Sequence, residues 1–146
     1  MEESRYDALK LENQLCFPLY AASREVIKQY RPFLDELGIT YTQYVTLMVL
    51  WEQRQISVKE LGQRLCLDSG TLTPVLKSLE AKQYITRTRS KEDERVLIAA
   101  ITPEGKALQD RAVEIPEQVA CRIRLDKDEA LLLYQLLYKV LDGFKE

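Results

Sequence analysis

The sequence predicts a mostly α-helical protein with a small β-hairpin, and three observations support this fold class. Two stretches with apolar residues at helical spacing, 58–65 and 72–79, lie one behind the other. Two runs of strand-forming residues follow, at 84–89 and 95–101. The residues between these runs, 90–94, are rich in charge and predict the loop of a hairpin. Helix, turn, helix and hairpin in this order are typical of a winged helix-turn-helix, in which the hairpin is the wing.

The second helix of the pair has one apolar face and one small, polar face. Asp68 and Ser69 are good N-cap residues for it. The polar face is rich in hydroxyls and carries a cation, which suits a close approach to a DNA groove. We expect it to contact DNA through Ser69, Thr71, Thr73, Pro74 and Lys77. Pro74 removes a helical hydrogen bond, so either the helix starts at Thr73 or its first turn is irregular. An ordinary solvated helix face is the alternative.

The predicted wing carries four cations and a short motif. The cations are Arg87, Arg89, Lys91 and Arg95. The run Asp93-Glu94-Arg95, followed by apolar residues and Ile101-Thr102, resembles the wing signature of the MarR family of bacterial transcription regulators. The resemblance implies that Arg95 enters the minor groove of double-stranded DNA while Asp93 holds its guanidinium. A narrow minor groove concentrates negative potential, and a planar cation fits it. A surface hairpin with a salt bridge is the alternative.

Composition excludes several other classes of protein. The 146 residues are enough for one domain, and they contain neither an apolar run of about 18 residues nor a signal-peptide pattern, so we expect a soluble, cytoplasmic protein without membrane contact. Histidine is absent and the three cysteines form no CxxC motif, which argues against His-based catalysis and a zinc site. We expect no metal, no cofactor and no enzymatic activity. The net charge of −2 permits DNA binding, because residues 57–102 hold eight Lys and Arg against six Asp and Glu.

A second, narrower resemblance lies in the first predicted helix. Residues 11–25 (LENQLCFPLYAASRE) and 67–74 (LDSGTLTP) are similar to the organic-hydroperoxide-sensing branch of the MarR family, the OhrR-type repressors and their staphylococcal relatives. The resemblance implies that Cys16 is the peroxide sensor. It also implies that Tyr30 and Tyr41 hydrogen-bond to this cysteine across a dimer. A small buried hydrophobe is the alternative role for Cys16.

The chemistry implied for Cys16 is a two-step oxidation. The thiolate attacks the O–O bond of an organic hydroperoxide and becomes a sulfenic acid, which a second thiol traps as a disulfide. In two-cysteine members of the branch the second thiol comes from the other subunit, and the resemblance implies Cys121 for it. A low-molecular-weight cellular thiol is the alternative partner. For Cys66, between Leu65 and Leu67, we expect core packing.

The chain on both sides of the winged unit is expected to form dimerisation helices. We place them at about 8–36 and 103–145, with the DNA-binding lobe at about 40–102, within a single MarR-type domain that spans 1–146. The last helix carries a long apolar stripe that a monomer of this size cannot bury. Together with the first helix it should form a two-fold homodimer, which places two recognition helices about 34 Å apart on a pseudo-palindromic operator.

Prolines complicate the boundaries of these helices. The first helix is expected to start at Leu11, to be distorted at Pro18 and to end or bend at Arg31-Pro32. The helix after the wing should run through Pro116 to Cys121. The helix that precedes the helix-turn-helix pair is expected to face the core with a stripe of four residues, Tyr44, Leu47, Met48 and Trp51.

Two other functions remain open at this point. The first is a MarR-type regulator controlled by a small aromatic acid, with Cys16 in a structural role, and thermal stabilisation by phenolic acids would support it. The second is a thiol peroxidase, which catalytic consumption of peroxide would support. The winged motif and the lack of a thioredoxin-like βαβ pattern argue against the peroxidase.

Overall fold

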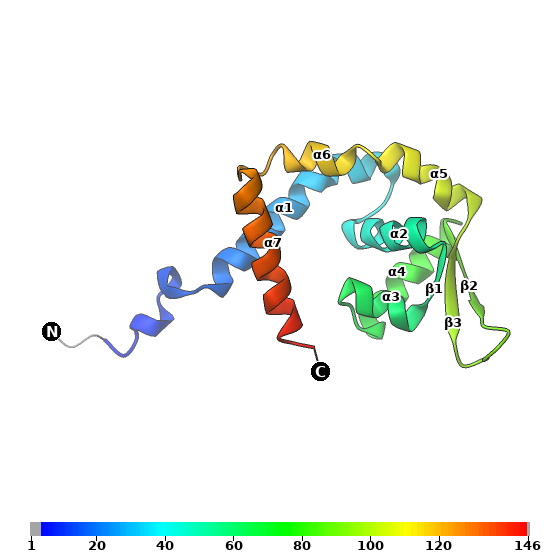
Figure 1. Cartoon of the computed structure of the whole chain (residues 1–146), viewed down its shortest axis with the longest axis horizontal. Helices are drawn as coiled ribbons and strands as arrows, with labels where there is room; N and C mark the ends of the chain where they lie inside the picture. The colour runs from blue at the N-terminus through cyan, green and yellow to red at the C-terminus, as the bar shows by residue number, and fades with distance from the viewer. Residues whose placement is uncertain (1–3, 146) are drawn as a thin grey trace.

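The computed structural model describes residues 4–145 and consists of a winged helix-turn-helix lobe with helices before and after it in the chain (Figure 1). The lobe comprises α2 (Tyr41–Gln53), β1 (Gln55–Ser57), α3 (Val58–Leu65), α4 (Ser69–Ala81), β2 (Ile85–Arg89) and β3 (Leu97–Ile101). The elements before it are two 3-10 turns, η1 (Asp7–Leu9) and η2 (Leu11–Asn13), and the helix α1 (Cys16–Leu37). The elements after it are α5 (Pro103–Ala112), α6 (Ile115–Ala120) and α7 (Lys127–Asp142). The predicted fold class is therefore confirmed.

The lobe is built around one leucine-rich core between its helices and its sheet. The predicted stripe of α4 faces this core, and Leu72, Leu76 and Leu79 are at most 1% exposed. The sheet is antiparallel with strand order β1-β3-β2, so the wing has a third strand, β1, that the sequence did not predict. Full burial of a leucine side chain contributes about 1.5–3 kcal/mol, so this core holds the recognition helix firmly on the sheet.

Side-chain caps determine where the helices of the lobe begin. Thr40 caps α2 and forms a capping box with Gln43. Asp68 caps α4, as predicted, and Thr102 caps α5, which has a proline in its first turn. Gly38 ends α1 in the left-handed conformation (φ 70°), which glycine adopts without steric cost. These local signals explain why the turns around the recognition helix were predictable.

The first helix begins later than predicted. α1 starts at Cys16 and not at Leu11, because η1 and η2 occupy the preceding chain. Pro18 therefore lies in the first turn of α1, where backbone N–H groups have no helical acceptor and a proline is tolerated. The expected distortion at this proline is absent for that reason, and Cys16 occupies the first position of the helix.

Two further expectations are wrong, on Met48 and on the helix after the wing, and at Pro32 one of two alternatives is excluded. Pro32 does not end the first helix, because Leu34 and Leu37 beyond it are buried and hold the helix on the lobe. Met48 is 41% exposed and does not belong to the core-facing stripe of α2. The helix after the wing is interrupted before Pro116, which lies in the first turn of a separate helix, α6.

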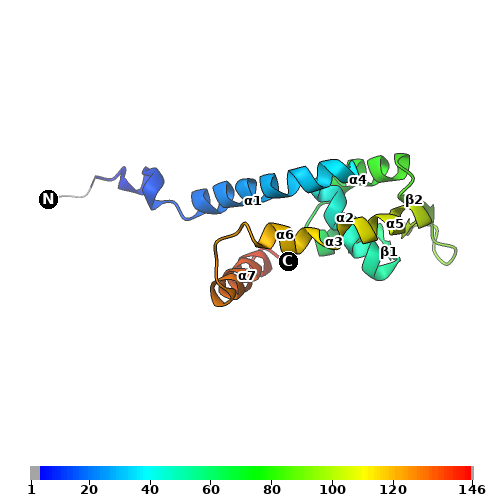
Figure 2. The ribbon, with the colours of Figure 1, turned by 90° about the horizontal axis from the view of Figure 1, so that it is seen from above.

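The helix α7 has almost no contact with the rest of its own chain. It crosses α1 in the view of Figure 1, but Figure 2 shows the two helices apart. A capping box of Asp126 and Glu129 starts it. All residues from 121 to 145 are exposed except Leu137, which is half-buried, so the apolar stripe of α7 faces outward. Among residues 4–145, no helix has the length and apolarity needed to cross a membrane.

Candidate nucleic-acid interface and redox site

The recognition helix α4 presents the face that the sequence predicted. Asp68 accepts a hydrogen bond from the backbone N–H of Thr71 at 2.7 Å, and this bonding holds the pKa of Asp68 below its usual value. The hydroxyl of Thr73 donates to the carbonyl of Ser69 at 2.7 Å. The helix thus begins at Ser69 and Pro74 lies inside it, so a start at Thr73 is excluded. Apart from the half-buried Thr73, the predicted contact residues of α4 are exposed, namely Ser69, Thr71, Pro74 and Lys77.

The tip of the wing holds Arg95 in a fixed pose. Its Nε lies 3.1 Å from Oδ1 of Asp93, and a terminal nitrogen lies 3.3 Å from Oδ2. The bond from the guanidinium lowers the pKa of Asp93. The side chain of Arg95 is nevertheless 91% exposed, and Arg89 and Lys91 nearby are also exposed. The wing therefore offers an oriented cation to an anionic surface.

Arg87 has a different environment from the other cations of the wing. Its guanidinium and its backbone N–H both donate to the carboxylate of Glu80 on α4, each at 3.1 Å. Its side chain is only 18% exposed, because it shares the face of β2 on which Ile85 is buried. Arg87 joins the wing to the recognition helix in this structure. No sequence signal marked Glu80 as the partner of Arg87.

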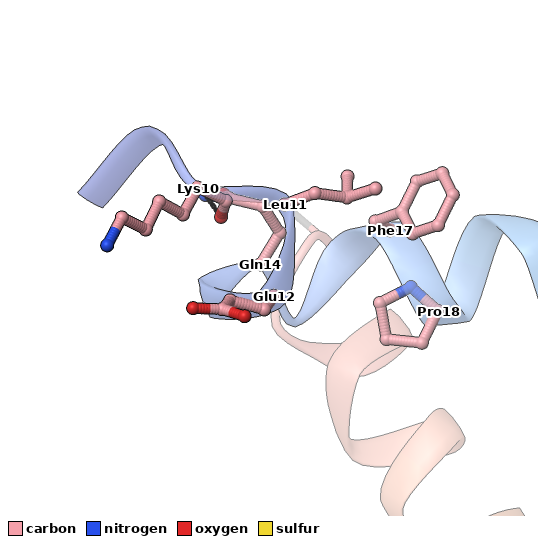
Figure 3. Close-up of a pocket in the computed structure, with 6 residues that line it drawn as sticks. All are labelled: Lys10, Leu11, Glu12, Gln14, Phe17 and Pro18. Atoms are coloured by element: carbon pink, nitrogen blue, oxygen red, sulfur yellow. Dashed lines mark hydrogen bonds between the residues drawn. The ribbon is translucent and has the colours of Figure 1, made fainter. Parts of the chain in front are cut away.

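The predicted sensor, Cys16, is exposed at the first position of α1. An open groove of about 690 Å³ lies between η2 and the start of α1, and its lining includes Phe17 and Pro18, which follow Cys16 in the chain, but not Cys16 itself (Figure 3). In Figure 3 the side chains of Leu11 and Phe17 point toward one another, whereas the amine of Lys10 points away. The thiol of Cys16 is therefore accessible from solvent at the start of α1.

The two predicted tyrosines lie together at the other end of α1. The ring centroids of Tyr30 and Tyr41 are 5.0 Å apart in an edge-on arrangement. Tyr44 packs against both rings and Trp51 packs against Tyr44, which extends the cluster beyond the residues predicted for the site. Burial raises the pKa of all three tyrosines, and for Tyr44 burial together with Tyr30 and Tyr41 raises it to about 12. Their hydroxyls therefore stay protonated near neutral pH and act as hydrogen-bond donors.

Within one chain, these tyrosines are far from Cys16. Fourteen residues of helix separate Cys16 from Tyr30, a distance of about 21 Å at 1.5 Å per residue. The second predicted thiol, Cys121, is exposed at the end of α6. Its neighbour Arg122 donates to Gln29 at 3.3 Å, so Cys121 lies toward the tyrosine end of α1. A single chain therefore brings neither Tyr30 nor Cys121 to the predicted sensor.

The third cysteine is not in the core. Cys66 is exposed and ends α3 with a left-handed backbone conformation (φ 57°), so the expected packing role is wrong. The tight turn between α3 and α4 forces the side chain outward between two partly buried leucines. Among residues 4–145, no three His, Cys, Asp or Glu side chains are grouped closely enough to hold a metal ion.

Comparison with known proteins places these features in a family. The family profile described as transcriptional regulator SarA/Rot matches residues 28–112. The organic hydroperoxide resistance transcriptional regulator of Bacillus subtilis (strain 168) is 48% identical over 140 residues, which cover 96% of this chain and 95% of that protein. The HTH-type transcriptional regulator SarZ of Staphylococcus saprophyticus is 45% identical over 127 residues, which cover 87% of each chain.

Solved structures of AbfR, a protein of Staphylococcus epidermidis, have the same fold. Reduced AbfR bound to DNA is 35% identical with a TM-score of 0.77, over 96% of this chain and 99% of that one. Overoxidised AbfR bound to DNA is 33% identical with the same TM-score, over 97% of this chain and all of that one. The profile, the relatives and the fold agree, and this chain belongs to the SarA/Rot-type transcription regulators of the MarR family.

Proposed function

We propose that this protein is a DNA-binding transcriptional repressor that senses organic hydroperoxides through Cys16 and releases its operator when this residue is oxidised. One observation carries the proposal: an exposed cysteine stands at the first position of α1 in a chain that also builds a winged helix-turn-helix. The relative in Bacillus subtilis is named for organic hydroperoxide resistance. AbfR has been solved in reduced and overoxidised forms, both bound to DNA, and in a disulfide form, which supports a redox role for this fold and favours the disulfide as the form that releases DNA.

The chemistry begins at the sulfur of Cys16. The thiolate attacks one oxygen of the hydroperoxide, the O–O bond breaks, and the alkoxide takes a proton and leaves as an alcohol. The sulfur loses two electrons to the peroxide and becomes a sulfenic acid. A second thiol then forms an S–S bond with this sulfur, and the sulfenic oxygen leaves as water. Each thiol reacts once until a reductant restores it, so one equivalent of hydroperoxide per subunit is enough to change the state of the protein.

The sensing site requires a second copy of the chain. Cys16 and Tyr30 lie about 21 Å apart along one rigid helix, so the phenols that would hydrogen-bond to the sulfur must come from the partner. The chain also exposes a large apolar surface on α1 and α7, which a two-fold dimer would cover. The most exposed large apolar side chains of this surface are Leu15, Tyr20, Leu131, Leu132, Tyr134 and Leu136.

The resolving thiol follows from the same geometry. Cys121 lies at the tyrosine end of α1, where the partner's sensor would also lie in the dimer. We therefore propose a disulfide between Cys16 of one subunit and Cys121 of the other, with a small cellular thiol as the alternative. Either product changes the packing between the dimerisation helices, about 8–36 and 103–145. Those helices determine the spacing of the two DNA-binding lobes, about 40–102.

The DNA-binding surface comprises α4 and the wing. Ser69, Thr71 and Lys77 of α4 are exposed and suit the major groove, whereas Arg95, oriented by Asp93, suits the minor groove. Thr73, Pro74, Arg89 and Lys91 complete the proposed contact set. Arg87 supports this surface through Glu80. A dimer then reads a pseudo-palindromic operator with half-sites about 34 Å apart.

The test is operator binding by fluorescence anisotropy before and after one equivalent of tert-butyl hydroperoxide per subunit. Wild type should bind at least about 100-fold more weakly after oxidation, roughly 3 kcal/mol, and recover with dithiothreitol. Cys16→Ser should bind equally well in both conditions. Cys121→Ser should show whether the partner's thiol or an added small thiol resolves the sulfenic acid. Wild-type binding that survives complete oxidation of Cys16 would refute the proposal.

A further inference from the structure

Three helix ends meet at the side chain of Gln43. Its Oε1 accepts from the backbone N–H of Thr40 at 3.0 Å and from Nζ of Lys82 at 3.2 Å. Its Nε2 donates to the hydroxyl of Ser78 at 2.8 Å. Lys82 also donates to the carbonyl of Gly38. The amide of Gln43 thus joins the start of α2 to the end of α4, and Lys82 extends the contact to the end of α1; we term this group the Gln43 junction.

The Gln43 junction has a fixed geometry. Gln43 is only 5% exposed, and both the oxygen and the nitrogen of its amide have partners. The amide is planar, so these bonds exist together in only one orientation of the side chain. A buried amide that loses a partner is strongly penalised. The first turn of α2 and the last turns of α4 are therefore held in one relative position.

The junction lies between the proposed sensing site and the DNA-binding surface. On one side, Tyr41 follows directly after Thr40 and packs against Tyr30. On the other side, Ser78 follows directly after Lys77 on the recognition helix. The bond from Gln43 turns Ser78 toward α2, so this hydroxyl does not belong to the DNA-contact face. A shift of Tyr41 moves the first turn of α2, and the amide carries this movement to α4.

We propose that Gln43 is a positioning residue that couples oxidation of Cys16 to the orientation of the recognition helix through Ser78 and Lys82. This inference rests on the proposed function, because it assumes that the phenols of Tyr30 and Tyr41 respond to the state of the partner's sulfur. Gln43 itself touches neither the thiol nor DNA. Substituting Gln43 should therefore change how far operator affinity falls on oxidation. It should change neither the oxidation of Cys16 nor the operator affinity of the reduced protein.

Four variants test whether Gln43 couples oxidation to the orientation of the recognition helix or only supports the fold. Gln43→Ala and Ser78→Ala cut the bond between α2 and α4 from opposite sides. Thr40→Ala is the matched control, because it removes the other half of the same capping box and leaves the bond to Ser78 in place. Gln43→Glu is the conservative variant, because its carboxylate still accepts from Thr40, from Lys82 and from the hydroxyl of Ser78.

The measured quantity is the ratio of operator Kd after and before one equivalent of tert-butyl hydroperoxide, with oxidation of Cys16 followed by mass spectrometry. Wild type, Thr40→Ala and Gln43→Glu should give a ratio of at least about 100. Gln43→Ala and Ser78→Ala should give a ratio below about 10, and the double variant should give no smaller value than either single variant. In all variants Cys16 should oxidise at the wild-type rate, and reduced operator affinity should stay within about threefold.

The outcomes separate this inference from the proposed function. A ratio of about 100 in both alanine variants would show that the junction is structural only, and the coupling proposal would fail alone. A wild type whose affinity does not fall on oxidation would overturn the proposed function and the coupling with it. Thermal unfolding checks that each variant is folded, and Ser78→Ala carries the test if Gln43→Ala does not fold.

Discussion

In the winged lobe, Leu72, Leu76 and Leu79 of α4 are at most 1% exposed, whereas Leu131, Leu132 and Leu133 of α7 are 45–57% exposed. The two regions are similar in leucine content but differ in how far the leucine side chains are buried. The lobe buries its apolar residues within one chain, whereas those of α7 stay exposed and need another surface to cover them. A change in the lobe core should therefore act on folding, whereas a change in α7 should act on assembly.

The largest expected effect comes from removing packing in the lobe. Leu79→Ala deletes a fully buried side chain beneath the recognition helix and should lower the free energy of unfolding by about 2–5 kcal/mol. Urea denaturation followed by circular dichroism measures this change. If Leu132→Ala, at an exposed position of α7, destabilised the lobe equally, the expected difference between the two regions would be contradicted.

The next effect should come from placing charge on the α7 face. Leu132→Glu with Leu136→Glu adds two carboxylates to the proposed dimer interface, where burial of charge is unfavourable. We expect a monomer in analytical ultracentrifugation and operator binding weakened at least about 100-fold, because two half-sites are no longer read together. Lys127→Glu with Lys139→Glu, at exposed lysines of the same helix, is the control for added charge. A double-leucine variant that stays dimeric would refute the α7 interface.

Local signals made the lobe predictable, and non-local partners explain what was missed. Asp68 as a cap and the leucine stripe of α4 are visible within a few residues of sequence. The strand β1 has only three residues, too few for a periodic pattern, and exists because it pairs with β3. The bond from Gln43 to Ser78 spans 35 positions in sequence and has no local signature.

The candidate site was predictable only in part, for a related reason. Cys16, Tyr30 and Tyr41 were identified by resemblance, because no spacing rule connects residues whose proposed contact needs a partner chain. The exposed position of Cys66 also escaped prediction, because flanking leucines suggest burial while the left-handed turn directs the side chain outward. The tyrosine cluster extends to Tyr44 and Trp51, which helical spacing identified as core residues and not as neighbours of the sensor.

Alkaline pH should test the tyrosine cluster. The pKa of Tyr44 is about 12 in the fold against 10.0 for the free phenol, so the unfolded chain releases this proton first as pH rises. Stability is therefore complete below about pH 10 and should fall between about pH 10 and 12, by roughly 2 kcal/mol. Tyr44→Phe should unfold like wild type at neutral pH and lose less stability over that range. Equal alkaline losses in both proteins would mean that Tyr44 is not the titrating group.

A smaller effect is expected at the wing. Arg95→Ala removes an exposed, oriented cation and should weaken operator binding about tenfold without changing the thermal unfolding temperature. Asp93→Asn should weaken binding less, because the cation remains and only its orientation is lost. Anisotropy titrations at several salt concentrations measure both. Unchanged operator affinity in Arg95→Ala would show that the wing does not contact DNA.

The smallest expected effect lies at Cys66, the one thiol of the lobe. Its left-handed conformation costs a non-glycine residue about 1–2 kcal/mol, while glycine adds about 0.5–1 kcal/mol of unfolded-state entropy. Cys66→Gly should therefore stabilise the lobe by about 0.5–1 kcal/mol in urea denaturation, and Cys66→Ser, which keeps the strain, should not. Both variants should keep the full loss of operator affinity on oxidation, because the proposed sensing thiols, Cys16 and Cys121, lie outside the lobe. If either variant lost that response, the lobe would take part in redox sensing. The proposed separation between a DNA-binding lobe that folds within one chain and a sensing site formed by two chains would then fail.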